Sequence, residues 1–319
     1  CLDTDRHNTP QTAQFFVRIG ENDLNLEITI VPTYYGENIH LRIRNEKEIK
    51  SLDKLGLQDQ VRSKYTDILH SKPGIIWLVG PSESGKTSTA YASLVDFDLD
   101  TKNIYTFEKS LFQPKANLRQ IQANFKNNVS HLKAIFGQQP DVLLLDADEE
   151  EILSFLQDVN LNSKTVLITL TGYSIADAMM KLSRFSTHKR YEILLNSNCI
   201  LAHRLAKKIC PKCREEYALS KSEQSELKNI MNIEFDKKFQ GSGCPECRNS
   251  GYAGRIGLYE FCLIDDDFRN LVWKSNSVAE MKQGIFINAQ YQLINDIQRK
   301  LTDGIISVEE SIRITRQLD

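Results

Sequence analysis

The sequence lacks any uninterrupted apolar run that approaches the roughly 18–20 residues needed to span a bilayer. It also lacks a charge excess, because 40 basic residues stand against 42 acidic ones and leave a formal net charge of −2. The charge balance excludes a global attraction to nucleic acid, and the missing apolar run excludes direct membrane insertion. We therefore expect a protein that binds no nucleic acid and that reaches a membrane only through partner proteins.

Cysteine is scarce, yet four of the seven cysteines form two Cys-x-x-Cys pairs. The first pair is Cys210 with Cys213, and the second is Cys244 with Cys247. Two such pairs indicate metal binding rather than disulfides, and four thiolates predict a closed, structural Zn²⁺ site. The 30 residues between the pairs exceed the usual zinc-ribbon spacing, so the site must close a long loop. Free buried thiols and a redox Cys-x-x-Cys are the alternatives.

The first part of the chain has the pattern of a small α+β domain, which we assign to residues 1–55. Residues 13–45 alternate between apolar and polar side chains in three stretches separated by turns, as antiparallel strands do. Residues 46–73 are charged and helical in pattern and end at Lys72-Pro73-Gly74. The sequence opens inside what reads as a domain, so we expect this N-terminal domain to be truncated.

Residues 56–205 have the pattern of an α/β domain. Continuously apolar strands are predicted at 74–79, 104–107, 142–145 and 165–170, with helical stretches between them. Such runs are typical of parallel strands that are covered on both faces.

The remaining sequence divides into a cysteine-containing module at residues 206–262 and a helical region at 263–319. In the helical region Ser277 and Ser307 fit N-caps, and Gly304 fits a helix stop between them.

The stretch GPSESGKT, from Gly80 to Thr87, matches the pattern GxxxxGK[ST] between an apolar strand and a helix-forming segment. In such a loop backbone N–H groups surround the β-phosphate, the lysine neutralises β- and γ-phosphate oxygens, and the threonine ligates Mg²⁺. The alternative is a glycine turn without a ligand. ATP and Mg²⁺ are thus the expected ligands, and the predicted contacts are Gly80, Ser82, Ser84, Gly85, Lys86, Thr87 and Ser88.

The acidic stretch DADEEE follows the predicted strand VLLL. Asp146 stands where other P-loop proteins hold Mg²⁺ directly or through water, and we include it among the nucleotide-site residues. Asp148, Glu149 and Glu150 are the candidates for a base that activates water. Two alternatives stay open, namely Mg²⁺ binding alone and a solvated helix start, where the helix dipole favours acidic side chains.

The phosphate loop, the cysteine pairs, ILAHRLAKKICPKC at 200–213 and GYAGRIGLYE at 251–260 together resemble the assembly ATPases of type II secretion and type IV pilus extension. The resemblance runs over essentially the whole chain, including VPTYYGENIHLRIR at 31–44. It implies a RecA-like core, a zinc module and a cytoplasmic hexamer. It also implies docking to inner-membrane platform proteins through an earlier N-terminal domain that we expect to be missing here.

Several catalytic positions depart from the family's pattern. The usual central glycine of the loop is Glu83, the glutamate that polarises water falls on Ala147, and the family's histidine falls on Thr171. Of the acidic segment after the second strand only Glu108 remains, and Lys109 replaces an aspartate.

The positions at which the family carries arginines that approach the γ-phosphate are also altered. One looks like Gln14 and another like Glu27, while Arg42 remains. The residues that hold Mg²⁺ and phosphate are thus largely kept, and those that orient water or neutralise transition-state charge are largely lost.

The sequence therefore predicts an α/β protein with a RecA-like P-loop NTPase core, a preceding partial α+β domain, and a C-terminal zinc module plus helices. The resemblance implies a cytoplasmic ATP-binding assembly protein with weak or absent hydrolysis, partnered with itself or with an active paralogue. One alternative is an active hexameric ATPase motor. The other is a zinc-stabilised scaffold that no longer binds nucleotide.

Overall fold

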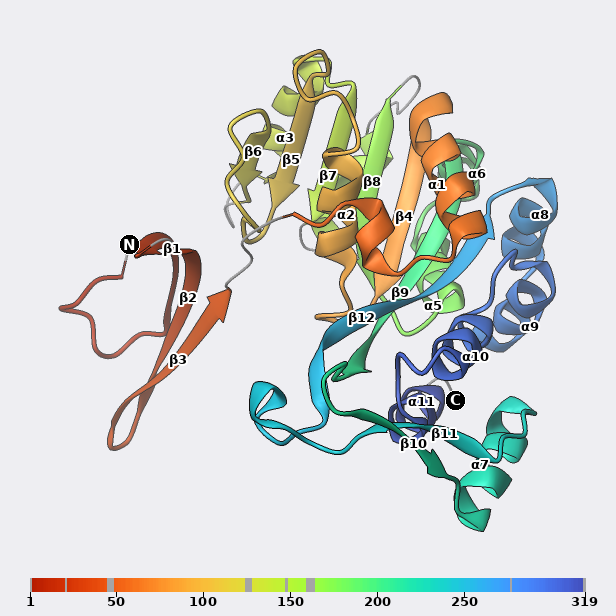
Figure 1. Cartoon of the computed structure of the whole chain (residues 1–319). Helices are drawn as coiled ribbons and strands as arrows, with labels where there is room; N and C mark the ends of the chain where they lie inside the picture. Colours follow the sequence, from red (N-terminus) through yellow and green to blue (C-terminus); the bar gives the residue numbers. More distant parts are fainter. Residues whose placement is uncertain are drawn as a thin grey trace.

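A seven-stranded sheet lies at the centre of the protein, in the order β12-β9-β4-β8-β7-β5-β6 (Figure 1). The computed structural model describes residues 2–20, 22–44, 49–123, 128–146, 149–158, 164–275 and 277–317. The strands of this sheet are β4 (Gly74–Gly80), β5 (Ile104–Glu108), β6 (Arg119–Gln122), β7 (Val142–Asp146), β8 (Thr165–Thr171), β9 (Ser197–Ile209) and β12 (Tyr252–Leu263).

The central sheet is parallel except at one edge, where β12 runs antiparallel to β9. The four predicted strands correspond to β4, β5, β7 and β8, so the α/β fold class is confirmed. Because parallel strands end at the same edge, the residues after β4, β5 and β7 gather there, where open α/β sheets bind their ligands.

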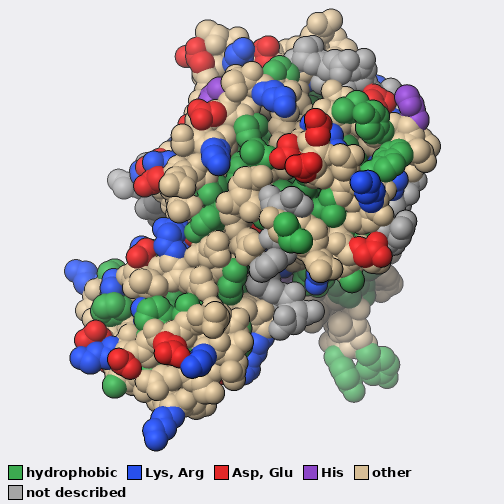
Figure 2. All heavy atoms as spheres, turned by 90° about the vertical axis from the view of Figure 1, so that its right-hand side faces the viewer, with side chains coloured by type: hydrophobic (Ala, Val, Ile, Leu, Met, Phe, Trp, Pro, Cys, Tyr) green, Lys and Arg blue, Asp and Glu red, His purple; other side chains and the backbone are tan. Residues whose placement is uncertain are grey.

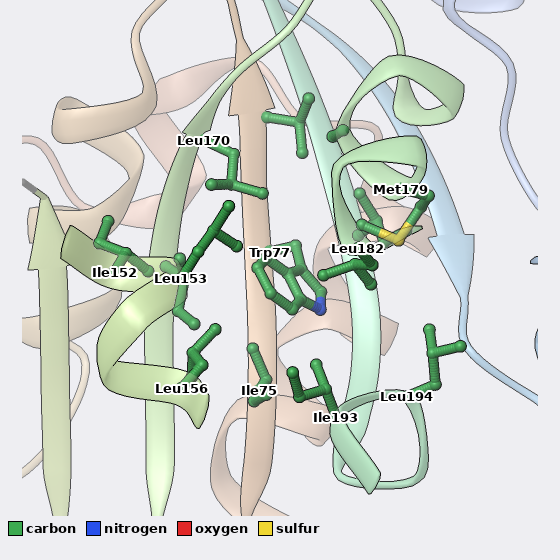
Figure 3. Packing of buried hydrophobic residues seen from close by; sticks show 14 of the residues in the cluster. Ile75, Trp77, Ile152, Leu153, Leu156, Leu170, Met179, Leu182, Ile193 and Leu194 are labelled. Atoms are coloured by element: carbon green, nitrogen blue, oxygen red, sulfur yellow. The ribbon is translucent and has the colours of Figure 1, made fainter. Parts of the chain in front are cut away.

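Period-two alternation along β4 buries side chains on both faces of the sheet. Ile75, Trp77 and Val79 enter one cluster, with residues of α3–α6, α8 and α9, and Ile76 and Leu78 enter another with residues of α1 and α2. Trp77 is fully buried at the centre of the first cluster, as Figure 3 shows, and its Nε1 donates to Ser197 Oγ at 2.9 Å.

Eleven α-helices lie within the described ranges, together with 3₁₀ turns at Leu52–Leu55, Lys181–Arg184 and Pro245–Cys247. None of these helices has the length and apolar character that crossing a membrane requires. The helices are α1 (Asp59–Ser71), α2 (Lys86–Leu94), α3 (Asn128–Gly137), α4 (Glu149–Asp158), α5 (Ile175–Met180), α6 (Thr187–Leu195), α7 (Lys221–Met231), α8 (Asp266–Lys274), α9 (Val278–Asn288), α10 (Leu293–Thr302) and α11 (Val308–Thr315).

The helical pattern of residues 46–73 resolves into two short pieces in its described part. A 3₁₀ turn ends at Gly56, whose φ of +84° is left-handed, and α1 follows from Asp59. The caps of the C-terminal region agree with prediction, because Ser277 and Ser307 Oγ atoms accept from the backbone N–H of Glu280 and Glu310. Gly304 has a φ of +63° between α10 and α11.

The first strands form a separate three-stranded antiparallel sheet, which Figure 1 shows beside the core. It consists of β1 (Gln11–Ile19), β2 (Asn22–Thr33) and β3 (Gly36–Arg44), as the alternation predicts. Its polar face contacts the core: Gln14 Nε2 and Asn25 Nδ2 donate to Leu111 O at 2.6 and 3.0 Å.

The cysteine module extends from the strands β9 and β12 at the antiparallel edge of the central sheet. Between them, β10 (Arg214–Ala218) and β11 (Lys237–Gly241) form a two-stranded sheet, and α7 lies between those strands in sequence. The module shares a hydrophobic cluster with α10 and α11. Figure 2 shows acidic and basic side chains interspersed on one face of the molecule, as expected from the small net charge.

Candidate functional site

The predicted phosphate loop lies between β4 and α2, at the carboxyl end of the parallel strands. Gly80 is required there, because a Cβ at this position would lie 2.3 Å from Ser84 Oγ and 2.8 Å from His203 O. Gly85 turns the chain into α2 with a φ of +99°. The loop thus has the close backbone approach and the helix N-terminus that phosphate binding requires.

Lys86 folds back over this loop in the described structure. Its Nζ donates to the carbonyl oxygens of Gly80 and Pro81, both at 2.8 Å. Burial lowers the pKa of Lys86 to about 8, while Asp146 opposes the shift. Ser84 Oγ is buried in the same loop without a hydrogen-bond partner among the described residues. These groups fit a phosphate ligand, which would take up the lysine charge.

Asp146 at the end of β7 lies beside Thr87, as the sequence predicts. Thr87 Oγ1 donates to Asp146 Oδ2 at 2.9 Å, and Thr169 Oγ1 of β8 donates to Oδ1 at 2.6 Å. A hydroxyl and a carboxylate side by side, next to a phosphate cradle, are suitable Mg²⁺ ligands or partners for its waters. Thr169 did not enter the sequence-based site, and no motif marks it.

Glu108 at the end of β5 is a further carboxylate at this edge, directly opposite Asp146 in the β5–β7 register. It is fully buried and accepts from Tyr91 Oη at 2.7 Å and Thr106 Oγ1 at 2.6 Å, while its Oε2 has no partner among the described residues. Burial raises the pKa of Glu108 to about 7, against those two hydrogen bonds, and the nearby Asp146 adds to the rise. Its place at a strand end was the signal that could have added it to the predicted site.

Of the three predicted water-activating acids, only Glu150 has a side chain that the structure describes. Asp148 and Ala147 lie outside the described residues, and so does the side chain of Glu149. Glu150 is exposed in the first turn of α4. Thr171, at the family's histidine position, is exposed at the end of β8 beside Gly80. The assignment of a base among these acids stays a prediction.

The three positions compared with the family's arginines form one row across the N-terminal sheet. Gln14 pairs with Glu27, and Glu27 pairs with Arg42. Ser110 Oγ donates to Gln14 Oε1 at 3.1 Å, whereas Arg42 forms an ion pair with Glu83 of the phosphate loop. The retained guanidinium is therefore engaged within its own chain.

His203 on β9 is a core residue. It is buried, its Nδ1 lies 3.2 Å from Val79 O, and its ring packs edge-on against Tyr259. Burial lowers the pKa of His203 to about 3, so the ring is neutral at physiological pH. Trp273, by contrast, is 40% exposed and contacts Tyr191 and Arg190 at the surface.

The four paired cysteines converge at the base of the module. Their Sγ atoms all lie within 4.8 Å of one another, with Cys210–Cys244 at 3.9 Å and Cys213–Cys247 at 3.8 Å. A tetrahedral Zn²⁺ with Zn–S of about 2.3 Å sets sulfur atoms about 3.8 Å apart, whereas a disulfide needs about 2 Å. The donor set therefore fits a closed metal site.

Known proteins match nearly the whole chain. A family model described as "Type II/IV secretion system protein" matches residues 2–313. Type II secretion system protein E of Pseudomonas aeruginosa is 29% identical over 323 residues, covering 99% of this chain and 63% of that protein. Type II secretion system ATPase E of Vibrio cholerae is 27% identical over 323 residues, covering 99% of this chain and 63% of that protein. The chain thus spans a little under two thirds of the length of these relatives.

Solved structures show the same fold. The Legionella pneumophila ATPase DotB superposes with a TM-score of 0.64 at 15% identity, covering 97% of this chain and 78% of that chain. The pilus retraction motor PilT, solved with bound ADP, superposes with a TM-score of 0.62 at 21% identity, covering 96% of this chain and 78% of that chain. These likenesses confirm the RecA-like architecture, and the family model, which spans residues 2–313, shows that the chain belongs to the type II/IV secretion system protein family.

Proposed function

We propose that this chain binds Mg-ATP in its phosphate loop as a cytoplasmic assembly subunit of a type II secretion or type IV pilus system. In this proposal its own hydrolysis of ATP is weak or absent. The observation that carries the proposal is the convergence of Lys86, Thr87 and Asp146 at one edge of the sheet. These residues would hold the phosphates and the Mg²⁺, which supplies charge neutralisation when bound.

Weak hydrolysis is expected because few cations among the described residues are free to approach the phosphates at this edge of the sheet. Gln14 and Glu27 stand in the row from which arginines would reach phosphate, and Arg42 is paired with Glu83. A transition-state arginine is worth about 10³–10⁵ in rate, so its loss removes most of the catalytic advantage. The subunit would then act by nucleotide occupancy within a hexamer of its own kind, or beside an active paralogue, at inner-membrane platform proteins. The closed Cys₄ site would hold Zn²⁺ in a structural role.

A second candidate function, an active motor, is favoured by Glu108. Its buried carboxylate lies opposite Asp146, with Oε2 unpartnered among the described residues, at the edge where a nucleotide would bind. A pKa near 7 suits a group that takes a proton from water at physiological pH. Glu108 thus joins Asp148, Glu149 and Glu150 as a candidate base.

Replacing Lys86 with alanine is expected to weaken Mg-ATP binding by about 100-fold, because the loop loses its cation at the β- and γ-phosphates. Affinity is to be measured by titration calorimetry on the zinc-loaded chain. Lys102→Ala, at an exposed position before β5, is the matched control and should bind as the parent does. Equal affinity in the Lys86 and Lys102 variants would contradict the proposal. If the parent binds no Mg-ATP, the alternative of a zinc-stabilised scaffold that no longer binds nucleotide is favoured.

A further inference from the structure

Glu83 holds an unusual conformation inside the phosphate loop. Its φ is +62°, a left-handed region that residues with a Cβ adopt at a cost of about 1–3 kcal/mol. The side chain is 55% exposed, so burial does not fix it. Its carboxylate instead forms an ion pair with the guanidinium of Arg42. The loop is therefore tied to a residue 41 positions earlier in the sequence, in a different sheet.

Arg42 belongs to the face of the N-terminal sheet that lies against the core. On the same face Gln14 and Asn25 donate to the backbone oxygen of Leu111, and Asn25 also donates to Phe112 O at 3.1 Å. Neutral amides thus hold the sheet on the segment after β5, and a charge pair holds it on the phosphate loop. The second contact responds directly to charge that enters the loop.

A nucleotide brings several negative charges to this loop. They would repel the Glu83 carboxylate, and they would attract Arg42, since a guanidinium binds phosphate as well as carboxylate. Both forces act against the ion pair. The carboxylate that pairs with Arg42 is the same one that opposes phosphate entry, so the contact and the ligand compete.

We propose that the Arg42–Glu83 ion pair is an autoinhibitory latch that holds the N-terminal sheet on the phosphate loop and that nucleotide phosphates open. The proposal rests on nucleotide binding by this loop, as proposed above. By linkage, a change that opens the latch by removing the Glu83 charge also tightens nucleotide binding. The latch converts occupancy of the loop into release of the sheet, and it needs no other residue of the catalytic set.

Two measurements on the zinc-loaded full chain test the latch. Energy transfer between dyes on unnatural amino acids at Tyr34 and Lys102 reports the position of the sheet, because Tyr34 is 93% exposed at the β2–β3 turn and Lys102 is exposed on the core. Calorimetry gives the Kd of Mg-ATP. Glu83→Gln removes the charge but keeps the side-chain size, and Glu234→Gln, which breaks the exposed Lys228–Glu234 pair, is the control.

Glu83→Gln is expected to tighten Mg-ATP binding about tenfold and to lower transfer efficiency without nucleotide. Arg42→Ala should lower transfer efficiency in the same way but should not tighten binding, because it leaves the Glu83 carboxylate to repel the phosphates. In the parent, Mg-ATP should lower transfer efficiency in the same direction, and Glu234→Gln should match the parent. Unchanged transfer efficiency in Glu83→Gln would overturn the latch. If Mg-ATP nevertheless bound more tightly, the cause would be the loss of repulsion between the Glu83 carboxylate and the phosphates. If no variant binds Mg-ATP, the proposed function fails, and nucleotide-free transfer alone decides whether the pair holds the sheet.

Discussion

Replacing Cys244 with serine is expected to remove the bound Zn²⁺ and to unfold the module between β9 and β12. The two-stranded sheet β10–β11 pairs only five residues on each strand, and such a sheet is marginal by itself. Holding both cysteine turns together closes a long loop, whose entropy the metal offsets. Structural Zn²⁺ sites contribute several kcal/mol or more to folding, so Tm should fall by roughly 10 °C or more.

The matched control for this change is Cys262→Ala, which removes a buried thiol of the central sheet that lies outside the four-cysteine cluster. It should keep one Zn²⁺ per chain by mass spectrometry of the metal content. EDTA treatment of the parent should reproduce the loss of Tm seen in Cys244→Ser. A Cys244→Ser protein that retains stoichiometric zinc, or a Tm that EDTA leaves unchanged, would refute the structural zinc site.

Replacing Asp296 with alanine is expected to destabilise the fold by about 3–5 kcal/mol, because it leaves a buried ammonium without its carboxylate. Asp296 and Lys300 are both fully buried, and Lys300 Nζ donates to Asp296 Oδ2 at 2.7 Å. The same carboxylate accepts from Tyr259 N at 2.9 Å and Arg299 Nη2 at 2.8 Å. The network therefore holds α10 on the antiparallel edge strand β12.

Thermal unfolding measures this effect, with Asp266→Ala as control. Asp266 forms an ion pair with Arg269 but is 93% exposed, so its loss should cost no more than about 1 kcal/mol. The double variant Asp296→Leu with Lys300→Met should recover most of the stability, since an apolar pair of similar volume often replaces a buried ion pair. An Asp296→Ala Tm as high as that of Asp266→Ala would contradict a structural role for the network.

Much of the α/β core could be predicted because its signals are local. The strands β4, β7 and β8 are continuous apolar runs, and the GxxxxGK[ST] spacing fixes the turn after β4. The cysteine cluster was predictable for the same reason, since each pair lies in one tight turn. In each case the motif itself is short, although the two cysteine pairs lie 30 residues apart.

The unpredicted features depend on contacts between distant residues. The apolar sequence of β9 is broken by His203 and Arg204, whose polar character alone suggests a surface position, yet both residues lie in the strand and are buried. Arg204 is tolerated there because Nη1 donates to His203 O at 3.0 Å and Nη2 to Tyr173 O. Likewise, the sequence shows Glu83 only as a replacement of the family's usual glycine, and its ion pair with Arg42 of β3 is visible only in the structure. The periodicity of apolar residues along the sequence carries no information about contacts between such distant residues.

Steady-state ATP turnover, measured on the preparation used for binding, tests whether the chain binds nucleotide but hydrolyses it poorly. We predict no turnover above that of Lys86→Ala at saturating Mg-ATP. Turnover that depends on Lys86 would contradict this prediction. The base would then be sought by comparing Glu108→Gln and Glu150→Gln.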